Sequence, residues 1–161
     1  MDIFAEYICA HKDDEICRAL TCVSYKKVYQ KQHRKELDDK QTNFELATYG
    51  DALLKFALCN LLLNEVSQLS EHKKQYEEDK FLIEVVAQHY NLLEYIKFDR
   101  EDKKIRQEYK FYKTQKDKKN PTKYIATTVE AVLGAIYKEN NDFGSICKLI
   151  ESWIDLYKQC K

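Results

Sequence analysis

The chain contains very few of the residues that make turns, with three glycines and one proline among 161 residues. A protein of many strands needs tight turns, and these depend heavily on glycine and proline. Long segments rich in leucine, alanine, lysine, glutamate and glutamine favour helices instead. We therefore predict an all-α helical bundle. Residues 1–161 are expected to form a single domain, because a chain of this length can bury a substantial core.

The bulk charge and the cysteines narrow the class of protein. The 27 basic and 27 acidic side chains balance, which argues against a strongly cationic protein but allows local segregation of charge. The chain has no apolar run of about 18 residues that could span a membrane, and its start lacks the basic region of a signal peptide. The six cysteines show no Cys-x-x-Cys pair and no histidine at zinc-finger spacing. We expect a cytoplasmic protein with free thiols and no contact with a membrane.

Apolar residues recur at helical spacing over most of the chain. The helices predicted in this way cover residues 2–11, 13–24, 43–66, 70–78, 79–90, 123–139 and 142–159. The charged segment 26–42 is predicted as a loop or a solvated helix, and the charged segment 99–123 as a loop. The helix over 43–66 is apolar on nearly every face, which predicts a buried central helix.

Two of the apolar helices each carry one carboxylate. Asp51 lies in the stretch 46–53, Leu-Ala-Thr-Tyr-Gly-Asp-Ala-Leu, and Glu130 lies in the stretch 127–137, Thr-Thr-Val-Glu-Ala-Val-Leu-Gly-Ala-Ile-Tyr. A buried carboxylate is costly unless it is paired, hydrogen-bonded or bound to a metal. If the two helices pack side by side, both carboxylates can bind a divalent cation such as Mg²⁺. The alternative is that Asp51 acts as a local cap after Gly50 and that Glu130 pairs with a lysine.

These stretches resemble the catalytic domain of the ribonuclease III family. Residues 46–53 are similar to its signature Leu-Glu-Phe-Leu-Gly-Asp-Ala-Val. Residues 19–25 resemble its Ala-Leu-Thr-His-x-Ser-Tyr segment, and residues 124–137 resemble its second motif, Asp-x-x-Glu-Ala followed by x-x-Gly-Ala-Ile-Tyr. The resemblance implies a helical homodimer that cleaves double-stranded RNA with Mg²⁺ or Mn²⁺ during RNA processing. It also implies that Asp51 and Glu130 are the catalytic, metal-holding residues.

The chain departs from the family pattern at three acidic positions. The family's acids fall here on Phe44, Ala47 and Thr127, and Glu45 lies about 120° around the helix from Asp51. Thr127 would then hold a water of the metal ion. A similar Ala/Thr pair occurs in Mini-ribonuclease III, a branch that resembles this chain at both positions and whose members are active. The alternative is a weakened or inactive ribonuclease III-fold protein that binds RNA or pairs with an active relative.

A lysine-rich segment leads into the Glu130 helix. The basic residues of this segment that we predict to contact RNA are Lys110, Lys113, Lys116, Lys118, Lys119 and Lys123. Lysines beside a metal site can neutralise phosphates, although an ordinary solvated loop is the alternative. No double-stranded-RNA-binding domain is expected after the last helix. The family dimer implies that Leu46, Tyr49 and Leu53 lie near a two-fold interface.

Overall fold

The computed structural model describes residues 2–10, 14–100 and 123–160. Within these ranges the chain is helical and contains no β-strand, which confirms the all-α prediction. The helices in the first half of the chain are α1 (Ile3–Ala10), α2 (Asp14–Ala19), α3 (Tyr25–His33), the short η1 (Asp39–Gln41) and α4 (Phe44–Leu62). Those that follow are α5 (Leu69–Glu77), α6 (Asp79–Phe81), the π-helical η2 (Leu82–Ala87), η3 (Leu92–Glu94), α8 (Lys123–Asn140) and α9 (Phe143–Gln159).

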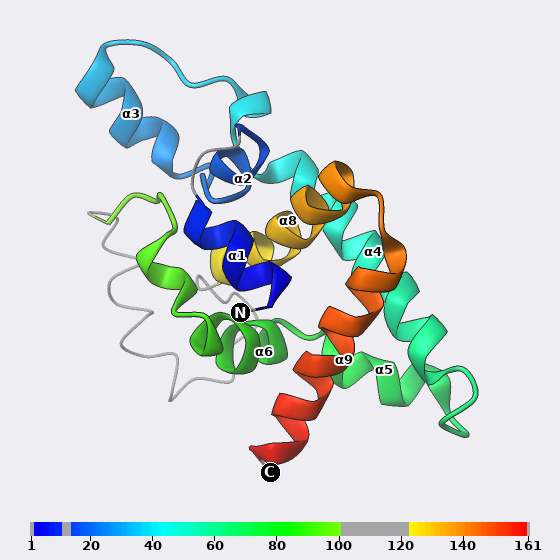
Figure 1. The fold of residues 1–161 in the computed structure, drawn as a ribbon. Coiled ribbons are helices and arrows are strands. Elements are labelled where there is room, and N and C mark those ends of the chain that lie inside the picture. The colour runs from blue at the N-terminus through cyan, green and yellow to red at the C-terminus, as the bar shows by residue number, and fades with distance from the viewer. Residues whose placement is uncertain (1, 11–13, 101–122, 161) are drawn as a thin grey trace.

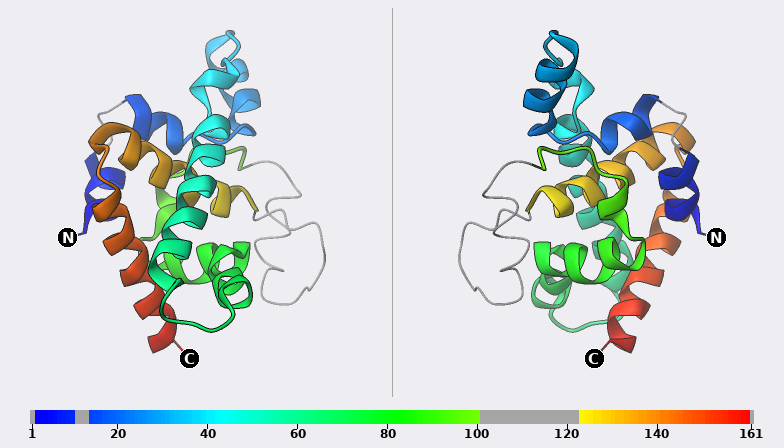
Figure 2. Two further views of the ribbon diagram at one scale, coloured as in Figure 1. Left: turned by 90° about the vertical axis from the view of Figure 1, so that its right-hand side faces the viewer. Right: turned by 90° about the vertical axis from the view of Figure 1, so that its left-hand side faces the viewer.

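Helices α4 and α8 cross at the centre of the bundle, and the other helices pack around them (Figures 1 and 2). The middle of α8 is apolar on all sides, and residues 131–136 are all buried. Such a helix needs neighbours on every face, and α1, α2, α4 and η2 contact it. The central position of the two motif helices therefore follows from their apolar composition.

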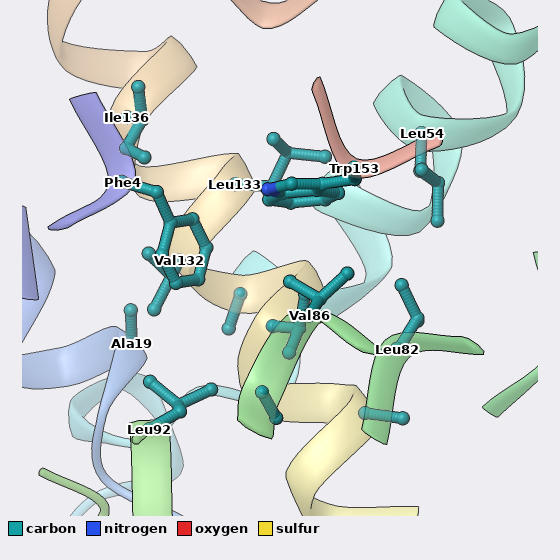
Figure 3. Close-up of a cluster of buried hydrophobic side chains, with 14 of the residues drawn as sticks. Phe4, Ala19, Leu54, Leu82, Val86, Leu92, Val132, Leu133, Ile136 and Trp153 are labelled. Atoms are coloured by element: carbon teal, nitrogen blue, oxygen red, sulfur yellow. The ribbon is translucent and has the colours of Figure 1, made fainter. Parts of the chain in front are cut away.

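One buried cluster joins the first and last helices (Figure 3). The ring of Phe4 in α1 packs edge-on against Trp153 in α9, with ring centroids 5.4 Å apart. The indole Nε1 of Trp153 donates to the hydroxyl of Tyr90 at 3.0 Å, and that hydroxyl donates to the carboxylate of Asp2. Every buried polar atom in this chain of contacts is therefore satisfied.

Helix α4 is not buried on every face, so that part of the prediction is wrong. The large apolar side chains Phe44, Tyr49 and Phe56 of α4, and Leu63 just after it, are 64%, 43%, 62% and 62% exposed. Helix α8 packs on one face of α4, whereas these large side chains remain mostly open to solvent in the described part of the chain. Periodicity alone cannot separate an interior face from an apolar face that has no partner within the protomer.

The remaining sequence expectations concern the segment 26–42, the thiols and the membrane. The segment is a solvated helix, α3, followed by the short η1. None of the six cysteines, all of which are described, forms a disulfide. Among the described residues, no helix is both long and apolar enough to cross a bilayer.

Candidate active site

Two glycines bring the backbones of α4 and α8 into contact. A Cβ atom added to Gly50 would lie 1.7 Å from the backbone oxygen of Glu130, and one added to Gly134 would lie 2.5 Å from the backbone oxygen of Leu46. Only glycine permits so close an approach. The crossing places Asp51, the neighbour of Gly50, beside the turn of α8 that carries Glu130. The packing of the two motif helices, which a shared cation site requires, is thus observed.

The Glu130 carboxyl group lies in an environment that disfavours its charge. Burial, followed by the negative charges of Asp51 and Asp79, raises the pKa of Glu130 to about 7. Lys123 and Lys55 oppose this rise. Three carboxylates therefore share one electrostatic environment, in which a bound cation would relieve their mutual repulsion.

Neither of the alternative roles for the two carboxylates is found among the residues that the structure describes. Asp51 lies inside α4 rather than at its end, and its carboxylate accepts from Lys55, one turn later, at 2.6 Å. Glu130 forms no ion pair with any described lysine or arginine. Within the described part of the chain, Lys123 and Lys55 therefore act on the half-buried Glu130 through their charge but form no ion pair with it.

The structure also locates the positions where the family acids are replaced. Ala47 is buried, and Thr127 is half-buried on α8, three residues before Glu130. Phe44 points outward, and Glu45 pairs with Arg18 at 2.7 Å. Glu45 is therefore engaged elsewhere and does not replace a missing acid.

A buried polar cluster below the site was not predicted from the sequence. Asn43, just before α4, donates from Nδ2 to the hydroxyl of Thr128 at 3.2 Å, and that hydroxyl donates to the carbonyl of Tyr124 at 2.8 Å. The thiol of Cys22 lies 3.6 Å from the same hydroxyl, and burial raises its pKa to about 11, so it stays neutral. This cluster ties the start of α4 to α8. Asn43 at a helix start was its only signal in the sequence.

The donor set suits a hard cation that keeps most of its waters. In residues 2–10, 14–100 and 123–160, no group of three or more His, Cys, Asp and Glu side chains is placed to enclose a metal. Mg²⁺ is held in many sites by one or two carboxylates, with water and substrate phosphate completing its shell. Asp51 and Glu130 fit this open kind of site. Asp79, at the start of α6, is an acidic neighbour that lies outside both sequence motifs.

The other predicted site residues are placed as follows. Lys123 is exposed at the start of α8, whereas Lys110, Lys113, Lys116, Lys118 and Lys119 lie outside the described residues. Leu46 and Leu53 are 4% and 8% exposed and pack inside the protomer, while Tyr49 is open to solvent. Of the three predicted interface residues, Tyr49 is the one that presents its side chain outward.

The fold and the site define a helical protein whose two central helices cross at glycines and each present a carboxylate. The family model of the ribonuclease III domain matches residues 45–141, which is more than half of the chain and includes both motif helices. The chain therefore belongs to the ribonuclease III domain family, whose members act on double-stranded RNA and generally depend on divalent metals. No curated protein and no solved structure matched the chain.

Proposed function

We propose that this protein is a divalent-metal-dependent endoribonuclease that cleaves double-stranded RNA during RNA processing. The observation that carries the proposal is the glycine-mediated crossing of α4 and α8, which sets Asp51 beside Glu130. Glu130 forms no ion pair with a described residue, so its carboxylate oxygens could bind a cation. A reducing compartment such as the cytoplasm fits the six free thiols.

Each residue of the site has a role that follows from its position. Asp51 and Glu130 would hold Mg²⁺ or Mn²⁺ through their carboxylate oxygens. The bound cation would supply activation of water and stabilisation of negative charge at the phosphodiester. Thr127 would orient a water beside Glu130, and the hydrogen bond from Lys55 would hold the Asp51 carboxylate in position. Lys123, exposed on α8, would contact the RNA phosphates.

The second candidate function is a catalytically weakened RNA-binding or partner protein of the same fold. The observation that favours it is the loss of acids at Ala47 and Thr127, together with the lack of a three-ligand cluster among the described residues. Under this second function, RNA binding would not depend on Asp51 or Glu130. The resemblance to Mini-ribonuclease III favours the enzyme and stays a prediction.

We further propose that the protein acts as a homodimer through the exposed face of α4. Tyr49 and Phe56 on this face contact Tyr137 and Phe143, with ring centroids 6.0 and 5.0 Å apart. An aromatic surface of this kind, next to the site, is typical of a subunit interface. Light scattering that showed only a monomer at micromolar concentration would contradict the dimer.

The test of the enzyme is cleavage of a long RNA duplex in Mg²⁺ or Mn²⁺. Asp51→Asn should lower the rate by roughly 100-fold or more, because it removes a charged ligand of the cation. Asp155→Asn is the matched control, because Asp155 is an exposed aspartate on α9 and should leave the rate unchanged. A wild type that fails to cut the duplex, with Asp51→Asn indistinguishable from it, would refute the enzyme.

Calorimetry separates the two candidate functions. The enzyme requires Mg²⁺ or Mn²⁺ binding that Glu130→Gln abolishes, whereas the weakened protein would bind RNA equally well with either side chain. The double variant A47E/T127D, which restores two family acids, should tighten binding of the cation. An unchanged affinity would show that these positions do not reach the bound ion.

A further inference from the structure

Helix α3 extends from the body of the protein, and no other described helix covers it (Figure 1). It has no buried residue, although it is nine residues long. A short polar helix is marginal in water unless side-chain contacts support it. Here the ring of Tyr29 packs on His33 at 4.3 Å, and Lys26 pairs with Asp39 beyond the helix end. The structure thus maintains an exposed helix that contributes nothing to the core.

A groove of about 410 Å³ separates α3 from the segment 96–100. Its lining includes two aromatic residues, Tyr25 and Phe98, and one acidic residue, Asp99. Three cations, Lys31, Lys97 and Arg100, complete its charged lining. Within the described part of the chain, none of these three cations forms an ion pair. The described lining of the groove is therefore basic, with three cations against one carboxylate.

The far wall of the groove is fixed to the core of the protein. The backbone of Lys97 forms hydrogen bonds with the first and last residues of the segment 20–22. Its N–H donates to the carbonyl of Leu20 at 2.8 Å, and its carbonyl accepts from the N–H of Cys22 at 2.9 Å. The guanidinium carbon of Arg100 lies 5.5 Å from the centre of the Phe98 ring. An arginine stacked on an aromatic face is already oriented and keeps its N–H groups for a phosphate.

The groove is connected to the candidate active site. The ring of Phe98 packs against Tyr124, with centroids 5.0 Å apart, in the first turn of α8. Lys123 precedes Tyr124 and shares one face of the helix with Glu130, because residues seven apart are two turns apart. A line of cationic and aromatic side chains thus leads from the groove along α8 toward the carboxylates.

We propose that the groove between α3 and the segment 96–100 binds the phosphate backbone of an RNA duplex, next to the strand held at the α4–α8 crossing. The identity of the ligand as RNA rests on the proposed function. The basic lining, its aromatic walls and the link to α8 are properties of the groove itself. Three cations that each neutralise a phosphate provide affinity that does not depend on sequence and falls with salt.

The experiment measures binding of a non-cleaved RNA duplex in EDTA across a range of salt concentrations. The triple variant K31A/K97A/R100A should bind at least about tenfold more weakly near 0.15 M salt. Its plot of log affinity against log salt should be shallower by two to three units, at about 0.9 for each phosphate contact. The control K74A/K148A/K158A removes the same charge from exposed lysines on α5 and α9 and should bind like wild type.

A conservative variant guards against loss of folding. K31R/K97R/R100K keeps every positive charge and should therefore retain the wild-type dependence of affinity on salt. If these side chains were only structural, the salt dependence would not have to follow their charge. Equal binding by the groove triple and the control triple would overturn the proposal, as would a wild type that binds no duplex. The cleavage assay tests the proposed enzyme separately. If the groove triple variant lost RNA binding while the wild type cleaved no RNA, the groove would be supported and the nuclease refuted.

Discussion

The α4–α8 crossing and the α3 groove place functional groups in opposite ways. At the crossing, the backbones of two helices touch at Gly50 and Gly134, and neighbouring side chains are buried. At the groove, a helix without buried residues stands away from the fixed segment 96–100, and long cationic side chains line the space between them. Geometry is set by the backbone in the first region and by flexible side chains in the second.

This difference matches what each region would have to do. Two carboxylates that share a cation must stay within fractions of an ångström of their positions, and a glycine contact between helices gives that rigidity. Contact with an RNA backbone tolerates and even benefits from adaptable lysine and arginine chains. We therefore expect substitutions at the crossing to affect the whole fold and substitutions at α3 to act locally.

The largest effect is expected for Gly50→Ala. The new Cβ would overlap the backbone of Glu130, so the helices must separate and the surrounding core must open. The free energy of unfolding should fall by roughly 3–5 kcal/mol, measured by chemical denaturation. Gly134→Ala should follow in the same direction.

The third glycine provides the matched control. A Cβ on Gly144, in the first turn of α9, would meet only the side chain of Asp142 at 3.3 Å. Gly144→Ala should change stability by less than about 1 kcal/mol, because alanine also favours the helix. If Gly50→Ala destabilised the protein as little as Gly144→Ala, the backbone contact would not fix the crossing, and the crossing and the groove would not differ in the way described.

An intermediate effect is expected for Glu130→Gln in the metal-free protein. The folded-state pKa of Glu130, about 7, lies above its ordinary value of 4.5. The contribution of this group to stability is therefore fully present below pH 4.5 and is lost as the pH rises through 7. Glutamine does not titrate, so the variant should gain on the order of 1–3 kcal/mol relative to wild type between pH 4.5 and pH 8.

Thermal denaturation in EDTA at both pH values measures this difference. Glu151→Gln is the control, since Glu151 is exposed on α9. Its thermal denaturation curves at the two pH values should match those of the wild type. A Glu130→Gln variant that gained nothing at pH 8 would mean that neither burial nor the neighbouring carboxylates disfavour the charged form of Glu130.

The smallest effect is expected on α3, for Lys26→Ala. The ion pair between Lys26 and Asp39 is largely exposed, and such pairs contribute about 0–1 kcal/mol. Global stability should hardly change, while amide hydrogen exchange in α3 should accelerate and that in α4 should not. Lys27→Ala, at an exposed neighbour that forms no ion pair with a described residue, is the control. Faster exchange throughout α4 would show that α3 is coupled to the core after all.

Much of the fold could be predicted from the sequence, because apolar periodicity and a shortage of turn residues both reflect local chemistry. The helix over 142–159 was predicted within one residue of α9 at its start, and its stripe through Ile146, Ile150 and Trp153 is buried. The pairing of the two motif helices was a condition for a shared site, and the sequence alone did not establish it. What the periodicity could not reveal was which apolar face of α4 meets α8 and which stays exposed.

The site was only partly predictable. Asp51 and Glu130 stand out because carboxylates in apolar helices demand an explanation. Asp79 gave no such signal, since its place near Glu130 depends on how α6 packs on α8 and not on any local pattern. The groove was missed for the same reason: Lys31 and Arg100 are ordinary charges in the sequence until the fold brings their segments together.

The contact between Phe4 and Trp153 has a consequence for how the chain is made. Helix α1 is synthesised well before α9, yet the fully buried ring of Phe4 packs against Trp153 in α9. During translation this contact can form only after α9 has left the ribosome, whereas Tyr90, the other ring that Phe4 packs against, emerges earlier. Since pairings between distant segments form late, part of the apolar face of α1 stays uncovered until then. A nascent chain stalled before Trp153 should therefore be a better client for chaperones than the finished protein.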